Sequence, residues 1–110
     1  MPTPEHGPLV TGLGDLLAEH GDRTYRELLR VPALSLGLFA VGPGHDDGQD
    51  PHASDEVYVV AAGRATLVVD GVSTPVWPGS LAYVPAGVLH RFADVTEDLR
   101  VYVVFAPPEP

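Results

Sequence analysis

The sequence predicts a small all-β domain, an antiparallel barrel or sandwich, preceded by one short helical turn. Three observations lead to this fold class. Twelve glycines and twelve prolines among 110 residues interrupt the chain too often for long helices. The apolar residues fall in short runs separated by turn signals, which is typical of sandwiches and barrels. Asp70-Gly71 lies between two such runs and has the sequence chemistry of a tight hairpin turn.

The elements follow in order along the chain. The N-terminal segment, residues 1–23, contains the one helix-like stretch, residues 14–19, in which Asp15 can cap a turn that Gly21 ends. The β domain is predicted over residues 24–106, followed by a tail over 107–110 that we expect to be loosely held. The eight predicted strands span residues 24–30, 33–41, 56–61, 65–69, 74–77, 81–84, 90–95 and 99–106.

Several of these strands are continuously apolar rather than alternating, notably over residues 57–62, 67–69 and 101–105. Such strands need cover on both faces. We therefore expect a barrel with a filled interior and either a second sheet or a partner chain outside it.

Composition excludes several classes of function. The net charge is −9, with six basic residues, all arginine, against fifteen acidic ones. This balance repels phosphate backbones and anionic lipid surfaces, so we expect neither a nucleic-acid partner nor a membrane surface. No apolar run reaches the roughly 20 residues of a membrane span. The start of the chain does not resemble a signal peptide and cysteine is absent, which predicts a cytoplasmic protein without disulfides.

Two of the five histidines are candidate ligands. We expect His6 and His20 to lie at the surface, and His45 falls in a glycine-rich acidic loop. His52 and His90 each lie beside a predicted strand. On one straight strand His52 and the nearby carboxylate of residue 56 would be roughly 13 Å apart, so sharing an ion requires a bend over residues 53–55.

Two segments resemble the motifs of a known family. Residues 50–63 resemble the first motif of the cupins (His-x-His, three or four residues, Glu, six residues, Gly), with His52, Glu56 and Gly63 in register. Residues 79–94 resemble the second motif (Gly, five residues, Pro-x-Gly, two residues, His, three residues, Asn). Its matching positions are Gly79, Pro85, Gly87 and His90, and Asp94 replaces the asparagine. The chain is thus similar to a small single-domain cupin of the conserved-barrel type, which implies a jelly-roll β-barrel.

The resemblance also implies a metal site. In cupins the motif histidines and glutamate bind a divalent metal inside the barrel, which assigns His52, Glu56 and His90 as ligands. Such a set suits Fe(II), Mn(II), Ni(II) or Zn(II). Asp50 stands where the family has its first histidine. It either ligates in place of that histidine or stays outside the shell, leaving a facial triad or a catalytic zinc with open positions. The purely structural alternative pairs Glu56 with Arg64 or Arg91.

Strand alternation predicts what lines the interior. Tyr58 shares the face of Glu56, and Phe92 and Asp94 share the face of His90. A mostly apolar lining with few polar groups is typical of a site for small molecules. Tyr58 and Asp94 are the candidates for proton transfer. Since no basic residue lies on these faces, phosphorylated and nucleotide-sugar substrates are not favoured.

Two hypotheses about function follow. The first is a metal-dependent enzyme that acts on a small organic molecule, with dioxygenase-type oxidation leading and isomerase or lyase chemistry following. The second is a non-catalytic, metal-free cupin that binds or senses a small ligand. Cupins commonly dimerise through an apolar outer face, here Val57, Val59, Tyr102 and Val104, so we expect a homodimer with residues 24–41 as the segment for strand exchange.

Overall fold

The computed structural model describes residues 7–45 and 51–109, which form one short helix and eight strands. The elements are α1 (Leu13–His20), β1 (Tyr25–Val31), β2 (Leu34–Val41), β3 (Asp55–Ala62), β4 (Ala65–Val69), β5 (Val72–Val76), β6 (Leu81–Val84), β7 (His90–Ala93) and β8 (Leu99–Ala106). All eight predicted strands are present, with ends displaced by two residues at most. Within the described part of the chain, no helix is long and apolar enough to cross a membrane.

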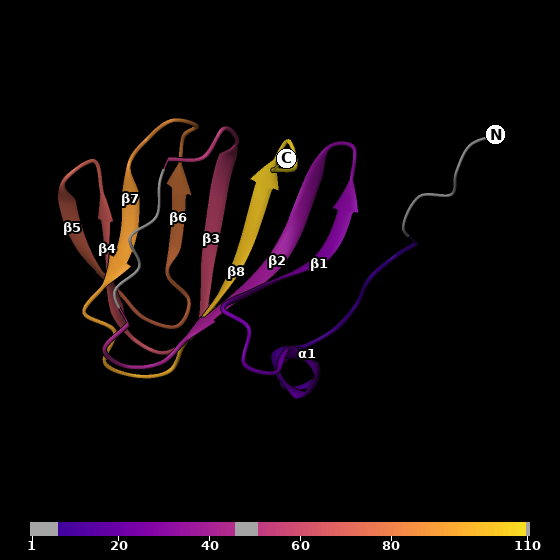
Figure 1. The fold of residues 1–110 in the computed structure, drawn as a ribbon, viewed down its shortest axis with the longest axis horizontal. Coiled ribbons are helices and arrows are strands. Elements are labelled where there is room, and N and C mark those ends of the chain that lie inside the picture. Colours follow the sequence, from indigo (N-terminus) through magenta and orange to yellow (C-terminus); the bar gives the residue numbers. More distant parts are fainter. Residues whose placement is uncertain (1–6, 46–50, 110) are drawn as a thin grey trace.

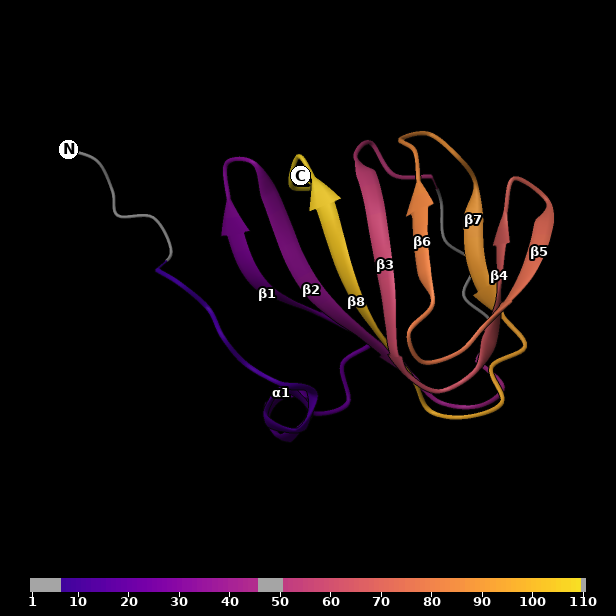
Figure 2. The same cartoon turned by 180° about the vertical axis from the view of Figure 1, so that it is seen from behind.

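The strands form two antiparallel sheets. The larger has the order β1-β2-β8-β3-β6 and the smaller the order β5-β4-β7 (Figure 1). The small sheet lies at one end of the molecule and the β1–β2 hairpin at the other, with α1 beside that hairpin's base; the view from behind shows the same division (Figure 2). The antiparallel β fold of jelly-roll type is therefore confirmed, as two facing sheets rather than one continuous cylinder.

Turn chemistry determines where strands end. Asp70 and Gly71 have φ angles of 49° and 78° between β4 and β5. Two consecutive left-handed residues are what a two-residue hairpin turn of type I′ requires. Gly63, with φ of 87°, separates β3 from β4, and a Cβ at this position would collide with the backbone carbonyl of Asp98. Only glycine fits there without moving the chain.

The core lies between the two sheets and is continuous from one to the other. Phe92 of β7 stacks on Phe39 of β2, with ring centroids 5.7 Å apart, and meets Tyr58 of β3 edge-on at 5.0 Å. Along β3 the buried residues alternate as the sequence predicts: Glu56, Tyr58 and Val60 are buried. Glu56 thus occupies a core position in a central strand, and its burial has to be explained by its partners.

Candidate metal centre

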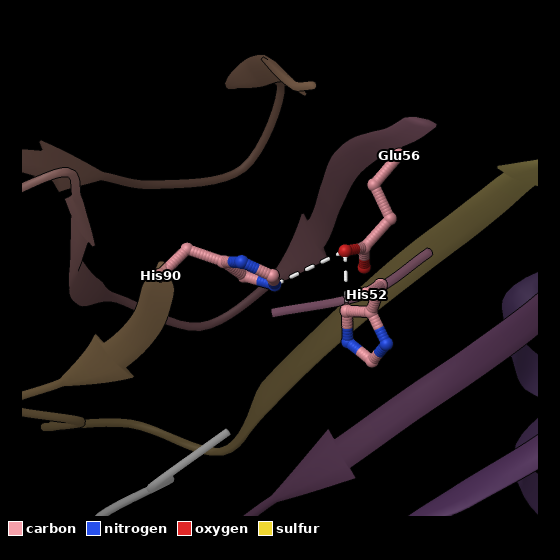
Figure 3. Close-up of side chains that lie close together, drawn as sticks. All are labelled: His52, Glu56 and His90. Atoms are coloured by element: carbon pink, nitrogen blue, oxygen red, sulfur yellow. Dashed lines mark ion pairs between the residues drawn. The ribbon is translucent and has the colours of Figure 1, made fainter. Parts of the chain in front are cut away.

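Three side chains from three separate segments converge at one end of the core. His52 precedes β3, Glu56 is the second residue of β3, and His90 is the first residue of β7. Their ligand atoms all lie within 4.8 Å of one another. Figure 3 shows the Glu56 carboxylate between the two imidazole rings. The structure thus brings together the three residues that the resemblance assigns as ligands.

Glu56 is held in the interior by the sheet. It pairs with Val84 of β6 on one side and with Phe105 of β8 on the other, so its strand is central at this point. Its side chain is only 1% exposed. Oε1 lies 3.0 Å from His90 Nε2 and 3.6 Å from His52 Nε2. A buried carboxylate without a compensating charge is costly, so these two rings, or a cation between them, must balance it.

The hydrogen bonding of His90 limits what can lie between it and Glu56. His90 Nδ1 is 2.9 Å from the carbonyl oxygen of Val88. Because a carbonyl oxygen only accepts, Nδ1 must carry the proton. In a neutral ring, Nε2 is then a lone-pair acceptor that faces a carboxylate oxygen at 3.0 Å. Two acceptors this close need a proton or a metal ion between them, with the proton carried by Nε2 or by the Glu56 carboxyl group. The donor set therefore fits a metal.

The bend expected before β3 is present. Residues 53 and 54 bend the chain, which brings His52 back toward Glu56 instead of leaving it along the strand direction. The segment is fixed by two contacts with the turn before β7: Gly87 N–H donates to His52 O at 2.8 Å, and Ala86 N–H donates to Asp55 Oδ1 at 2.9 Å. These bonds couple the two sequence motifs directly.

A cavity of about 420 Å³ opens onto the site. It is lined by Thr24, Tyr25, Phe39, Pro51, His52, Glu56, Tyr58, Val103, Phe105 and Glu109. Most of these described lining residues are apolar or aromatic, and none of them is an arginine. Burial, followed by the negative charges of Glu27 and Glu56, raises the pKa of Tyr25 to about 12, which keeps this phenol protonated at neutral pH.

The two candidates for proton transfer lie in different places. Tyr58 lines the cavity, and its ring centroid is 5.9 Å from that of His90. Asp94 does not share the face of His90: β7 ends at Ala93, and Asp94 adopts a left-handed φ of 51°, which turns the chain outward. The structure places Asp94 in a separate surface cavity with His45 and Arg91.

Three further sequence-based expectations concern Asp50, an arginine partner for Glu56, and the position of His20. The possible ligand Asp50 lies outside the described residues. The structural alternative for Glu56 is not what the structure contains, because Arg64 pairs with Glu97 at 3.5 Å and Arg91 lines the separate surface cavity. The surface position expected for His20 is wrong: this ring is buried, and Nε2–H donates to the carbonyl of Arg23 at 2.8 Å.

Sequence reasoning missed Glu109. This residue of the tail lines the cavity, and its Oε2 lies 3.5 Å from His52 Nδ1. It stands 57 positions from His52 and outside both motifs, so spacing could not find it. The available signal was an acidic residue set among prolines directly after a core strand.

Comparison with known proteins agrees with the fold and with the motifs. The family model described as "Cupin domain" matches residues 37–105. The uncharacterized protein SCO3923 of Streptomyces coelicolor is 50% identical over 99 residues, covering 88% of this chain and 94% of that protein. The dimethylsulfoniopropionate lyase DddW of Ruegeria pomeroyi is 30% identical over 73 residues, covering 66% of this chain but only 48% of the lyase.

Among solved structures, the polyketide cyclase RemF from Streptomyces resistomycificus superimposes with a TM-score of 0.68 and 25% identity, covering 78% of this chain and 66% of the cyclase. The family match spans most of the β domain and includes His52, Glu56 and His90. The two-sheet fold, the two motifs and the family match agree, and the chain belongs to the cupin family.

Proposed function

We propose that this cupin binds a divalent transition metal through His52, Glu56 and His90 and acts on a small organic molecule in the adjoining cavity. The observation that carries the proposal is the 3.0 Å contact of His90 Nε2 with Glu56 Oε1, both buried, while Nδ1 of the same ring donates to Val88. Fe(II), Mn(II), Ni(II) and Zn(II) all suit two imidazoles and a carboxylate.

Lewis-acid chemistry of the lyase or isomerase type has the best support. A divalent ion in this site would polarise a substrate oxygen. Tyr58 lines the same cavity beside His90, where its phenol can donate a proton to a substrate and the resulting phenolate can take a proton back. The similarity to a protein named as a dimethylsulfoniopropionate lyase and to one named as a polyketide cyclase supports this class.

Dioxygenase-type oxidation is the second candidate. Its support is the ligand set itself, because two histidines and one carboxylate with open positions are the arrangement of non-haem iron oxygenases. The described ligand cluster consists of these three residues. The two candidates differ in their requirements, since only the oxygenase consumes molecular oxygen.

The cavity also limits the substrate class. Among the described residues, its lining carries two carboxylates, Glu56 and Glu109, four aromatic side chains and no arginine. A phosphorylated substrate would bring two or more negative charges beside these carboxylates, with no arginine among the described lining residues to pair with them. We therefore propose a neutral or positively charged small molecule with one oxygen that can approach the ion.

Metal content decides the first part of the proposal. Protein purified without chelator and without added metal is expected to contain close to one transition-metal ion per chain by elemental analysis, and a His90→Ala variant to contain almost none. Wild type without metal, even after incubation with each of the four ions, would favour the non-catalytic, metal-free cupin instead.

Activity separates the reaction classes. Oxygen uptake after loading with Fe(II) would support the dioxygenase. Consumption of dimethylsulfoniopropionate, followed by proton NMR under nitrogen with each metal in turn, tests one named lyase substrate. Loss of that consumption in Tyr58→Phe, with metal content unchanged, would assign the proton transfer to Tyr58.

A homodimer is proposed on separate grounds. On the outer face of the large sheet, Val57 pairs with Tyr83 and Val59 with Leu81, and the two β6 side chains are 61% and 73% exposed. Strand β6 is also an edge of its sheet. Light scattering should give a dimer mass for wild type and a monomer mass for Leu81→Glu, with Val72→Glu on the small sheet as the exposed control.

A further inference from the structure

The chain after β8 returns to the mouth of the metal site. Pro107 and Pro108 follow the last strand, and Glu109 comes next. The proline rings restrict the backbone φ angles over this short stretch. Glu109 is a lining residue of the cavity, and its side chain is 25% exposed. The described part of the tail, residues 107–109, is thus part of the site, whereas the sequence predicts a loosely held segment.

Glu109 makes two contacts with the segment that carries His52. Oε1 accepts a hydrogen bond from the backbone N–H of Ser54 at 3.1 Å. Oε2 lies 3.5 Å from Nδ1 of His52, whose side chain is 24% exposed. The same carboxylate therefore holds the bend that brings His52 toward Glu56 and faces the ring itself.

The tail is anchored on its other side by β1. The Arg30 guanidinium donates to the backbone carbonyl of Glu109. Arg30 is in turn held by Glu27 through three contacts of 2.9 to 3.2 Å. Because Arg30 and Glu27 belong to the edge strand of the large sheet, the position of Glu109 depends on that strand as well as on Ser54.

The two nitrogens of His52 face different carboxylates. Nε2 is 3.6 Å from Glu56 Oε1, and Nδ1 is 3.5 Å from Glu109 Oε2. Glu109 is therefore on the side of the ring away from the ligand cluster and is not one of its members. Histidine ligands commonly donate their second N–H to a carboxylate, which fixes the tautomer and orients the ring.

We propose that Glu109 is a positioning residue, which accepts the Nδ1 proton of His52 and so presents Nε2 toward Glu56 and a bound ion. This inference rests on the proposed metal site, but the state of the His52 ring can be measured without metal. A bare ion pair between two quarter-exposed side chains contributes little to stability. The expected role of Glu109 is therefore geometric.

A double-mutant cycle tests the coupling of Glu109 to His52. Zn(II) affinity of the full chain is measured by competition with a chromogenic chelator. Glu109→Ala should weaken binding by about 10- to 100-fold, and Glu109→Gln, which keeps an acceptor oxygen, should weaken it less. In a His52→Ala background, Glu109→Ala should change affinity by less than about twofold. The matched control is Glu97→Ala, since Glu97 forms an exposed ion pair with Arg64.

Long-range proton–nitrogen NMR of the metal-free protein gives the second readout, at a pH well above the ordinary histidine pKa of about 6.5. The His52→Ala spectrum assigns the ring. Wild type should show the Nδ1–H tautomer, and Glu109→Ala should shift His52 toward the Nε2–H tautomer. A predominantly Nε2–H ring in wild type, or one that Glu109→Ala leaves unchanged, would overturn the inference. Failure of wild type to bind Zn(II) and each of the other three ions would overturn the proposed function, and the tautomer would still decide the role of Glu109.

Discussion

Two histidine–carboxylate pairs meet at the candidate metal centre, and they are built differently. In the inner pair, Glu56 and His90 are both 1% exposed and their facing atoms are 3.0 Å apart. In the outer pair, Glu109 and His52 are 25% and 24% exposed and 3.5 Å apart. The inner pair is fixed by two sheets that pack on each other, whereas the outer pair is fixed by a bend and the C-terminal tail.

This difference separates two tasks at the same centre. The inner pair supplies a buried charge and a lone pair whose positions the core determines, so it can hold an ion with little rearrangement. The outer pair lies at the cavity, where His52 and Glu109 are both lining residues. Glu56 of the inner pair lines the same cavity but is far less exposed, and the geometry of His52 depends on residues far away in the sequence.

Breaking the inner pair should have the largest effect. Glu56→Gln keeps the side-chain volume but removes the buried charge, so Zn(II) affinity should fall more than about 100-fold, beyond the roughly 10- to 100-fold cost of losing a supporting residue. Isothermal titration calorimetry measures this. Glu97→Gln, an exposed ion-pair residue, serves as control. Affinity within tenfold of wild type would mean that Glu56 is not a ligand.

The cost of replacing a glycine by alanine should also differ between the surroundings of the inner pair and those of the outer pair. A Cβ at Gly63, at the end of the strand that carries Glu56, would collide with the rigid backbone of Asp98, and the residue has a left-handed φ of 87°. Gly63→Ala should therefore destabilise the fold by about 3 kcal/mol or more. Chemical denaturation gives the free energy of unfolding.

Gly37→Ala, in strand β2, is the corresponding glycine-to-alanine change next to the cavity. A Cβ at Gly37 would collide with the ring of Tyr25, a side chain that lines the cavity and can swing aside. The cost should therefore be smaller, about 1 to 2 kcal/mol. Equal losses for the two alanine variants would contradict the distinction between rigid inner and adjustable outer support.

His52→Ala should reduce Zn(II) affinity less than His90→Ala. His52 is a quarter exposed at the cavity, so water can take its place on the ion, whereas His90 is buried and its removal leaves Glu56 without its nearest side-chain partner. Competition titrations of both variants give the ratio. A greater loss for His52→Ala would reverse the roles assigned to the two pairs.

The smallest expected effect is on the pH dependence of stability, and it comes from Tyr25, which lines the cavity beside the outer pair. The folded chain holds its phenol proton up to a pKa of about 12, against 10 for the ordinary residue. The stability linked to this group is therefore fully present below pH 10 and is lost as the pH rises toward 12. Tyrosinate absorbance should contain a component that titrates at about pH 12, and Tyr25→Phe should remove it.

The sequence predicted the inner pair better than the outer one. Turn residues such as Asp70 and Gly71 locate the strands, because their left-handed angles have few alternatives. The motif spacing located Glu56 and His90 for a related reason, since each is the inward residue at the start of a strand. Strand alternation then failed at Asp94, because β7 ends one residue earlier and turns outward.

Glu109 and His20 show what local patterns cannot reveal. The contact of Glu109 with His52 depends on tertiary hydrogen bonds of Glu109 with Arg30 and with Ser54. The burial of His20 depends on a hydrogen bond to Arg23 and on its position at the end of α1. Both positions depend on contacts with other parts of the chain, which the composition of the N-terminal and C-terminal segments does not reveal.

Anomalous diffraction tests the central claim most directly. Crystals of the full chain grown with Zn(II) should be measured on both sides of the zinc absorption edge. The account predicts one strong anomalous peak within coordination distance of His52 Nε2, Glu56 Oε1 and His90 Nε2. A map without a peak at these three atoms, or with zinc bound only elsewhere on the acidic surface, would contradict it.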